Sequence, residues 1–345
     1  MATISFNYIH PDFKLNNQSV NKENLFEIAT VFLNSKEEHE KHLGEFLLTW
    51  FNDSEYIEMT TSGSTGTPKL IRIKKQAMVN SAIATGSFFD LKNGDKVLTC
   101  LPVKFVAGKM MLVRSFILGL NMDYVEPNSK PLKNNSTFYD FVAMIPLQVR
   151  NSLHELQNVK TLLIGGAKID SDLEKELIPL STQTFASYGM TETVSHVALR
   201  KMGQLNYKVL PNIQLSTDER GCLIIDAPMI LEEKIITNDL VNLISDKEFI
   251  YLGRADNIVN SGGIKLFPEQ IEEKIAPFIK NRFFVTGKPD AILGEKLILV
   301  IEGTKYKLPE TVFENLGQYE KPKEIVFIDK FNETETGKII RKNNL

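Results

Sequence analysis

The chain has few cysteines, no long apolar run and no visible export signal. Its 345 residues include two cysteines, Cys100 and Cys222, which are too few for a disulfide framework or a cysteine metal site and which suit a reducing compartment. The most apolar run, from Met110 to Leu120, contains Arg114 and is too short to span a bilayer. Residues 1–14 lack a cationic start followed by an apolar core. These absences predict a cytoplasmic protein with no integral membrane association.

The small net charge bears on whether the protein binds nucleic acids or other polyanions. A formal net charge of −3 provides no electrostatic argument for binding nucleic acid or an anionic membrane surface. The composition, with 43% hydrophobic and 24% charged residues, is ordinary for a soluble globular protein, and the length is sufficient for two or three domains. Any capacity to bind an anion must therefore be local.

A loop rich in glycine and hydroxyl groups, Thr60–Lys69, follows a predicted strand, Tyr56–Met59. Glycine allows successive backbone N–H groups to converge on an anion, hydroxyls add donors, and the lysine adds a positive charge. Pro68 and Leu70 on either side of Lys69 exclude a Walker A loop. By composition alone such a loop is more often a surface connection than a polyphosphate site. Its candidate ligands are Thr61, Ser62, Gly63, Ser64, Thr65, Gly66 and Lys69.

A second polar segment, Ser187–Thr193, follows a strand predicted over Gln183–Ala186. Ligands of open α/β sheets bind at the carboxyl ends of strands. The ring of Tyr188 suits a base, the hydroxyl of Thr191 suits a phosphate, and Glu192 offers an oxygen ligand to the Mg²⁺ that accompanies ATP. A polar turn with a half-buried tyrosine explains the same residues without a ligand.

Two later segments complete a pattern. Residues 251–272 have the sequence YLGRADNIVNSGGIKLFPEQIE, and residues 334–341 have the sequence TETGKIIR. With the two polar segments above, they resemble the signature sequences of the adenylate-forming superfamily, which contains acyl-CoA synthetases, peptide-synthetase adenylation domains and luciferases. The resemblance implies that the protein uses ATP, Mg²⁺ and coenzyme A. Taken singly, the later segments would be a charged turn between strands and a frayed basic tail.

The resemblance also implies roles for individual residues. The Thr60–Lys69 loop would hold the β- and γ-phosphates of ATP, Asp239 would bind the ribose hydroxyls, and Arg254 would contact the ribose and phosphate region. Asn238 precedes Asp239 where the family usually has glycine, and asparagine also enters left-handed conformations. The other nucleotide-binding residues implied are Gly165, Gly166, Ala167, Tyr188, Gly189 and Met190.

Catalysis and domain movement are implied for the C-terminal part of the chain. Lys338 would bridge the acyl carboxylate and the α-phosphate during adenylation, and Asp256 would be the pivot of a rotating C-terminal domain. After the rotation, Gly262 and Gly263 would face coenzyme A. Thr191 and Glu192 would join Lys338 as catalytic residues, with Glu192 as the metal ligand.

Residues 188–195, YGMTETVS, are similar to the o-succinylbenzoate:CoA ligase subgroup of menaquinone biosynthesis. That similarity implies that Ser195 and His196 line the acyl pocket. The acid of this subgroup has a second carboxylate, which requires a cationic partner in an otherwise apolar pocket. Arg114 is the candidate and Lys109 the second choice, although an arginine on an apolar helix is more often a surface residue. Phe105 replaces a histidine that is usual in acyl-CoA ligases and would be an aromatic gate.

Hydrophobic periodicity predicts an α/β fold. Helical spacing occurs in Glu23–Asn34, Glu37–Trp50, Lys75–Phe89, Lys109–Leu118 and Leu147–Leu156, and strands are expected over Lys96–Leu101, Asn121–Val125, Phe141–Ile145 and Thr161–Ile164. This alternation predicts a mostly parallel sheet flanked by helices. Gly221–Ile225 and Glu248–Leu252 are expected to be antiparallel strands.

A smaller α+β unit is expected after Asp256. Its predicted elements are the helices Pro268–Ala276 and Pro309–Leu316 and the strands Phe283–Thr286, Lys296–Glu302 and Glu324–Phe327. We therefore predict an AMP-binding domain over residues 1–255, shortened before the phosphate loop, and a mobile C-terminal lid over residues 256–345 with its hinge at Asp256.

The resulting functional prediction is an AMP-forming acid:CoA ligase, with o-succinylbenzoate as the preferred acid. Its expected partners are a small carboxylic acid, ATP and coenzyme A, and a homodimer is compatible with it. Another aryl- or acyl-CoA ligase, a carrier-protein-loading adenylation enzyme and a non-catalytic nucleotide-binding protein are the alternatives.

Overall fold

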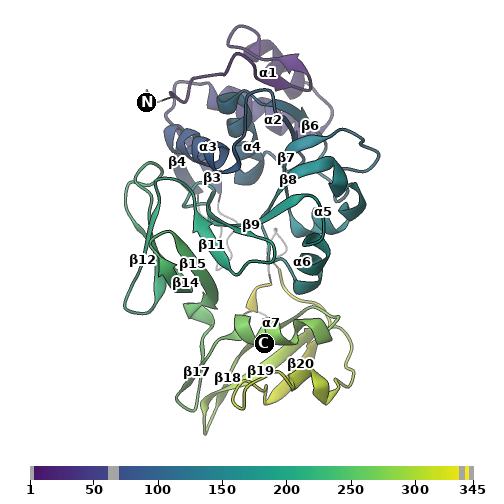
Figure 1. Cartoon of the computed structure of the whole chain (residues 1–345), viewed down its shortest axis with the longest axis vertical. Helices are drawn as coiled ribbons and strands as arrows, with labels where there is room; N and C mark the ends of the chain where they lie inside the picture. Colours follow the sequence, from purple (N-terminus) through teal and green to yellow (C-terminus); the bar gives the residue numbers. More distant parts are fainter. Residues whose placement is uncertain (1–3, 61–69, 334–338, 342–345) are drawn as a thin grey trace.

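One sheet of 13 strands runs through most of the chain. The computed structural model describes residues 4–60, 70–333 and 339–341, and within these ranges a second sheet, of five strands, is formed by residues after Asp256. Figure 1 shows the large sheet and its helices in the upper part of the molecule and the small sheet below them. The predicted α/β fold class is confirmed.

The parallel half of the large sheet is built from βαβ units. In spatial order its strands are β9 (Gln183–Gly189), β8 (Val159–Ile164), β7 (Tyr139–Met144), β5 (Lys96–Thr99), β6 (Asn121–Tyr124) and β1 (Lys14–Leu15), and β2 (Gln18–Ser19) forms the edge. The helices of this half are α3 (Lys75–Phe89), α4 (Val106–Leu118), α5 (Pro146–Arg150), η1 (Leu153–Asn158) and α6 (Ser171–Leu177).

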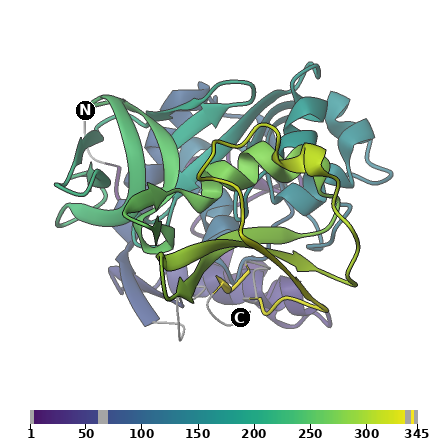
Figure 2. The ribbon, with the colours of Figure 1, turned by 90° about the horizontal axis from the view of Figure 1, so that it is seen from below.

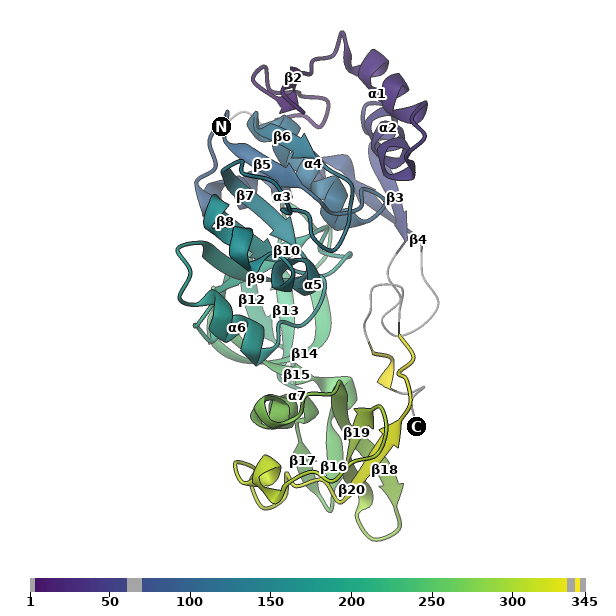
Figure 3. The same cartoon turned by 90° about the vertical axis from the view of Figure 1, so that its right-hand side faces the viewer.

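Alternate residues of the parallel strands face two different cores. Val97, Phe141 and Leu163 pack in the larger core with residues of α3 and α4, whereas their sequence neighbours Leu98, Val142 and Leu162 pack in a second core with residues of α5 and α6. Successive side chains of a strand point to opposite faces, so continuous apolar strands require helices on both sides. Figure 3 shows the parallel strands in succession with α5 and α6 beside them.

The antiparallel strands continue the same sheet beyond β9. In order they are β10 (His196–Lys201), β11 (Asn206–Val209), β15 (Glu248–Arg254), β14 (Ile235–Ser245), β13 (Cys222–Asp226) and β12 (Gln214–Thr217). Because β9 and β10 pair directly, residues 187–200 connect the two halves. The expected antiparallel region is therefore an extension of the parallel sheet.

The N-terminal part contributes two helices and a separate hairpin. The helices α1 (Leu25–Leu33) and α2 (Glu38–Trp50) pack on the larger core through residues such as Ile28 of α1 and Trp50 of α2. The hairpin pairs β3 (Tyr56–Thr60) with β4 (Leu70–Lys74), and Thr60 lies opposite Leu70 in its register. Thr60 and Leu70, which flank the predicted phosphate loop, are thus neighbours.

The small sheet has its own hydrophobic core. It comprises β16 (Val259–Ser261), β17 (Ile264–Leu266), β18 (Phe283–Asp290), β19 (Gly294–Glu302) and β20 (Glu324–Ile328), with α7 (Pro268–Ile275) and the short helices η2 (Ala255–Asn257), η3 (Ala276–Phe278) and η4 (Glu310–Phe313). Its core contains only residues from Val259 onward. Figure 2 shows this unit from below, and Figures 1 and 3 show α7 on the side that faces the large sheet.

Several predicted elements have different limits. The helix expected over Leu147–Leu156 is two pieces, because Asn151 and Ser152, which are poor helix formers, separate α5 from η1. The helix expected over Pro309–Leu316 is the single turn η4, and its Thr311 and Val312 are β-branched. Strand β9 extends to Gly189, so Ser187 and Tyr188 lie in the strand instead of after it. Among the described residues, no helix has the length and apolarity needed to cross a membrane.

Candidate active site

Tyr188, near the end of β9, and Arg254, the last residue of β15, meet Asp239 inside β14. The Tyr188 hydroxyl donates to Asp239 Oδ2 at 2.6 Å, and Arg254 Nη1 lies 3.4 Å from Asp239 Oδ1. Asp239 and Arg254 are direct neighbours in the β14–β15 register, so strand pairing itself creates this contact. Arg254 Nη2 also donates to Asp256 Oδ2 at 2.8 Å. We refer to Tyr188, Asp239, Arg254 and Asp256 as the nucleotide side.

Burial and charge act together on the nucleotide side. Burial raises the pKa of Asp239, against the hydrogen bond from Tyr188 and the charge of Arg254, which lower it. Burial and the neighbouring Asp239 raise the pKa of Tyr188, which keeps this hydroxyl a donor. Burial would lower the pKa of Arg254, but the hydrogen bond to Asp256 and the charge of Asp239 raise it overall. Each charge here has a partner of opposite sign.

The part of β14 before Asp239 is held by side chains that were not predicted from the sequence. The Thr237 hydroxyl accepts the Asp239 N–H at 3.1 Å and donates to the Leu223 carbonyl at 2.8 Å. Arg220 Nη1 donates to the side-chain oxygen of Asn238 at 3.1 Å. Asn238 lies inside β14 and is absent from the described non-glycine residues with positive φ. The left-handed conformation suggested for it is therefore wrong.

Arg114, Ser195 and His196 form a second group, which we call the acid side. Arg114 on α4 is 2% exposed, and its Nη2 donates to Ser195 Oγ at 3.0 Å. His196 begins β10 and is also buried, with Nδ1 3.3 Å from Ser195 Oγ. The structure thus brings together three residues predicted from segments 81 positions apart. Arg114 is a buried residue, and the surface alternative is wrong.

The Arg114 guanidinium has no carboxylate partner within the described part of the chain. Among the residues that the structure describes, its Nη1 approaches only the sulfur of Met111, at 3.8 Å, and its Nε has no hydrogen-bond partner. Burial lowers its pKa to about 9, which still leaves the group charged at neutral pH. A buried, unpaired charge is costly for a folded protein, so this site is suited to an anion supplied from outside.

Lys109 is less suited to that role. Its Nζ donates to the carbonyls of Val103 and Lys104 at 2.7 and 2.8 Å. The ammonium group is therefore bonded to the segment that precedes α4. Burial lowers the pKa of Lys109 to about 8, against the charge of Glu45. The nearby Phe105 precedes α4 and is half-buried. Its proposed role as an aromatic gate stays a prediction.

Tight backbone packing explains two glycines close to these groups. A Cβ on Gly108 would lie 2.4 Å from the Pro102 carbonyl oxygen, and one on Gly189 would lie 2.4 Å from the Ser195 carbonyl oxygen. Real Cβ contacts are not this short, so larger residues would displace the start of α4 or the turn after β9. The turn is fastened by Thr193, whose hydroxyl accepts the Met190 N–H at 2.9 Å.

The remaining nucleotide-site candidates lie around the carboxyl ends of β8 and β9. Gly165 follows β8 and packs against Ser187 of β9, since a Cβ there would lie 2.5 Å from Ser187 Oγ. Gly166 and Ala167 are exposed, as is Glu192, and Thr191 is half-buried. Their roles in binding ATP stay predictions.

The residues described provide one suitable carboxylate for Mg²⁺ in this turn, that of Glu192. They contain no group of three or more histidine, cysteine, aspartate or glutamate side chains able to hold a metal by themselves. This arrangement fits Mg²⁺ that arrives with ATP, because Mg²⁺ is commonly bound by one or two carboxylates together with substrate phosphates.

Asp256 lies in η2, between the last strand of the large sheet and the first strand of the small one. Around it the two parts touch: a Cβ on Gly253 would lie 2.7 Å from Glu269 Oε2, and Lys168 Nζ lies 3.7 Å from Glu273 Oε1. Gly262 and Gly263 form an exposed turn with φ of 59° and 83°. The predicted ligands Thr61–Lys69 and the predicted catalytic Lys338 lie outside the described residues.

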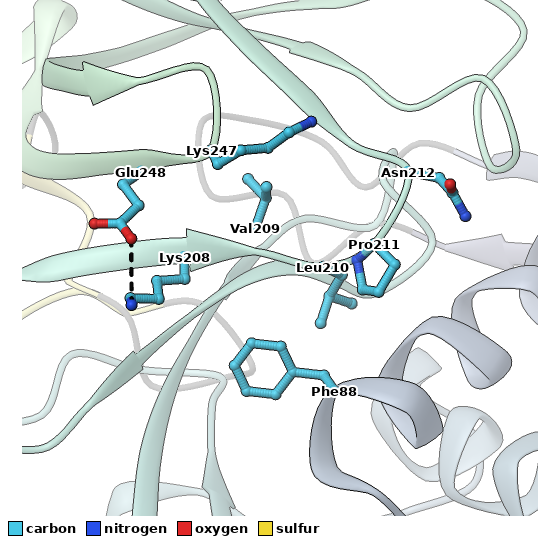
Figure 4. Close-up of a pocket in the computed structure, with 8 residues that line it drawn as sticks. All are labelled: Phe88, Lys208, Val209, Leu210, Pro211, Asn212, Lys247 and Glu248. Atoms are coloured by element: carbon cyan, nitrogen blue, oxygen red, sulfur yellow. Dashed lines mark ion pairs between the residues drawn. The ribbon is translucent and has the colours of Figure 1, made fainter.

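A surface cavity of about 320 Å³ is lined by none of these residues. Figure 4 shows its lining residues, which are Phe88, Lys208, Val209, Leu210, Pro211, Asn212, Lys247 and Glu248. None of them was predicted as a site residue. Lys208 is paired with Glu248 at 3.2 Å and Lys247 with Asp246 at 3.7 Å, so neither lysine of this cavity is an unpaired cation like Arg114.

The fold defines a two-sheet α/β protein with two buried polar groups beside the end of β9. A family model described as AMP-binding enzyme matches residues 49–226. The chain belongs to the AMP-binding enzyme family.

Individual relatives are consistent with this assignment. An acyl-CoA synthetase (AMP-forming)/AMP-acid ligase II-like protein from Dyadobacter fermentans is 35% identical, with a TM-score of 0.63 over 92% of this chain and 97% of that chain. The 2-succinylbenzoate--CoA ligase of Lactococcus lactis is 26% identical over 83% of this chain and 70% of its own length. The Bacillus subtilis O-succinylbenzoate Coenzyme A Synthetase in complex with ATP and magnesium ion is 19% identical, with a TM-score of 0.73 over 83% of this chain and 69% of that chain, which shows the shared fold.

Proposed function

We propose that this protein is an ATP-dependent acid:CoA ligase that converts o-succinylbenzoate to o-succinylbenzoyl-CoA in menaquinone biosynthesis. The reaction would activate the carboxylate as an acyl-adenylate and then transfer the acyl group to coenzyme A, with release of pyrophosphate and AMP. The AMP-binding family supports the adenylation chemistry. The relatives named as 2-succinylbenzoate--CoA ligases support the choice of acid.

One observation carries the substrate class: the buried guanidinium of Arg114 has no counter-ion in the described structure. An acid with two carboxylates can present one to ATP and the other to Arg114. A bidentate arginine–carboxylate contact also fixes orientation. A monocarboxylic acid would leave the buried charge unpaired, so we expect it to be a poorer substrate.

The nucleotide side supports the ATP assignment. Asp239 has two carboxylate oxygens that can accept the ribose hydroxyls, and its partners Tyr188 and Arg254 hold it in place. Glu192 would be the protein ligand of Mg²⁺, which withdraws negative charge from the phosphate oxygens. Pyrophosphate would leave toward the Ser62–Lys69 loop, and the Lys338 ammonium would stabilise the charge that develops during attack on the α-phosphate.

We propose that residues 256–345 rotate as a lid about Asp256 between the two half-reactions. The separate core of this part and its small set of contacts with the large sheet support a movement as one unit. After rotation the Gly262–Gly263 turn would face coenzyme A. We expect the enzyme to act in the cytoplasm. We also propose that it forms a homodimer, which sedimentation analysis would detect.

A pyrophosphate-exchange screen tests this function. Purified protein is incubated with ATP, labelled pyrophosphate and each of a set of aromatic and aliphatic acids, with and without coenzyme A. We expect o-succinylbenzoate to support the fastest exchange and the fastest coenzyme A-dependent AMP release. Faster turnover of another acid would make the protein a different acyl- or aryl-CoA ligase. Exchange without transfer to free coenzyme A would favour a carrier-protein-loading enzyme, and no exchange with any acid would refute adenylation.

A further inference from the structure

A chain of hydrogen bonds connects Arg114 to α3 through two residues of the β9–β10 connection. Arg114 Nη2 donates to Ser195 Oγ at 3.0 Å, and Ser195 Oγ lies 3.3 Å from His196 Nδ1. His196 Nε2 lies 3.1 Å from Thr85 Oγ1. Thr85 was not selected from the sequence, because nothing in its neighbourhood indicates a site. Thr85, Arg114 and His196 are all buried.

The position of every proton in this series of hydrogen bonds follows from Thr85, at the end farthest from Arg114. A hydroxyl group has one hydrogen, and that of Thr85 is donated to the Ser81 carbonyl at 3.0 Å. Thr85 Oγ1 can therefore only accept from His196, which makes Nε2 the protonated ring nitrogen. In a neutral imidazole the other nitrogen is an acceptor. Nδ1 then requires the hydroxyl proton of Ser195, and the Ser195 oxygen is left to accept from Arg114.

The neutral state of His196 is supported by its surroundings. It is buried, and the one formal charge that lowers its pKa is the Arg114 guanidinium. No carboxylate is bonded to its ring among the residues the structure describes. An imidazolium here would place two positive charges beside each other in a buried site. Arg114 is thus the single charge of this group.

We propose that Thr85 and His196 are positioning residues that set the acid specificity of the enzyme by orienting Arg114 through Ser195. The proposal rests on the proposed function and names what selects a dicarboxylic acid. Because the Ser195 proton is directed at His196, the Ser195 oxygen holds one amino group of the guanidinium. In the described part of the chain Nε has no acceptor and Nη1 has only the weak acceptor Met111 Sδ, so both can donate to the second carboxylate. Reversing the tautomer would turn the His196 proton toward Ser195 and the Ser195 proton toward Arg114, which cannot accept it.

The first test measures the tautomer in the unliganded protein. Protein labelled with ¹⁵N-histidine is examined by two-bond ¹H–¹⁵N correlation NMR, with His196→Gln used to assign the signal among the five histidines. We expect the neutral Nε2–H form throughout the range from pH 6 to 8. This range includes the ordinary histidine pKa of about 6.5, so an exposed histidine would change its charge within it. A protonated Nδ1, or a charged ring in this range, would overturn the proposal.

The second test removes the acceptor at Thr85. Thr85→Val has nearly the same shape but cannot accept from Nε2, so we expect the Nδ1–H form to become populated. The KM for the dicarboxylic acid should rise about tenfold while kcat changes little, since one oriented hydrogen bond is affected. Thr85→Ser keeps the hydroxyl acceptor and should have the wild-type KM and tautomer. If Thr85 acted only through packing of its methyl group, Thr85→Ser would instead raise the KM.

Thr182→Val is the matched control. Thr182 is buried and its hydroxyl donates to the Leu156 carbonyl at 2.6 Å, outside the acid side. Thr182→Val should lower the melting temperature by about as much as Thr85→Val does, and it should leave the KM for the acid unchanged. An equal KM for wild type and Thr85→Val would overturn the positioning role. Failure of the proposed function would be seen differently, as absence of AMP release by the wild type with every acid, whatever tautomer the NMR measurement finds.

Discussion

The nucleotide side and the acid side bury charge in opposite ways. On the nucleotide side, Arg254 contacts both Asp239 and Asp256, and Tyr188 donates to Asp239. On the acid side, the charge of Arg114 meets a serine hydroxyl and a methionine sulfur. Only the first group is complete without a ligand. Under the proposed function, the nucleotide contacts would be formed before ATP binds, and the unpaired charge of Arg114 would be kept for the acid.

An unpaired buried charge reduces stability, and this cost is a sign of function. Natural proteins depart from complete pairing of buried polar groups mainly where a site requires it. Arg200 provides the contrast within the same molecule. Its side chain is 15% exposed, and its guanidinium makes two bonds to Glu174, at 2.6 and 2.9 Å. Arg200 is paired within the fold, whereas we propose that Arg114 is kept for a ligand.

The largest effect is expected for the residue that would join the two sides. Lys338→Ala should slow the adenylation half-reaction by about 10² to 10³-fold, because a cation placed at the developing charge is worth roughly 3 to 4 kcal/mol. Thioester formation from a supplied acyl-adenylate should be spared. Both half-reactions are measured separately by rapid quench, with the exposed Lys330→Ala as control. Equal losses in both steps would contradict the role of Lys338.

Replacing Arg114 should separate function from stability. Arg114→Met retains much of the side-chain volume, and we expect a loss of about 10²-fold in kcat/KM for the dicarboxylic acid, equivalent to roughly 3 kcal/mol for a buried charged contact. A monocarboxylic analogue should lose far less. The ratio of the two kcat/KM values is the measurement.

The same variant should be as stable as the wild type or more stable by about 1 to 3 kcal/mol, since it removes an unpaired buried charge. Arg200→Met is the matched comparison, and it should lose about 3 kcal/mol because Glu174 is left without its partner. Urea unfolding of both variants measures this difference. Destabilisation of the two variants by the same amount would show that Arg114 is a structural residue.

A smaller effect is expected on the nucleotide side. Asp239→Asn keeps the shape but removes the charge that accepts from Tyr188 and faces Arg254. We expect the KM for ATP to rise about 10- to 50-fold, as a charge-assisted hydrogen bond contributes about 1.5 to 3 kcal/mol. The KM for the acid should change little, which steady-state kinetics with each substrate varied in turn would establish. A change confined to the acid KM would reverse our assignment of the two sides.

The smallest effect is expected for Tyr188→Phe. The ring can keep its contact with Phe249, whose centroid is 5.1 Å away, and only the hydroxyl bond to Asp239 is lost. We expect about a three- to tenfold rise in the KM for ATP, corresponding to roughly 1 kcal/mol. The double variant with Asp239→Asn should be no worse than Asp239→Asn alone, because both changes remove the same interaction. Additive losses would indicate that Tyr188 contacts ATP independently of Asp239.

Sequence reasoning located the long elements and the motif residues more reliably than their supports. The apolar pattern predicted α3 with its observed limits, and β5, β7 and β8 within a few residues. It did not predict β4, β10 or α6, and it joined α5 to η1. Short strands that depend on distant partners have weak local signals. The support of Asp239 by Thr237 and of His196 by Thr85 was missed for the same reason: a single threonine has no recognisable pattern.

The amino-acid sequence by itself determined the family, the α/β alternation and the residue types able to bind a nucleotide and an acid. These features depend on local order along the chain: hydrophobic spacing, glycine and hydroxyl runs, and a few charged residues within motifs. Tertiary structure alone decided which charges are paired. Arg254 faces Asp239 through the β14–β15 register, whereas Arg114 is enclosed by elements that bring it no carboxylate among the described residues. Pairing depends on distances between side chains far apart in sequence, and only packing sets those distances.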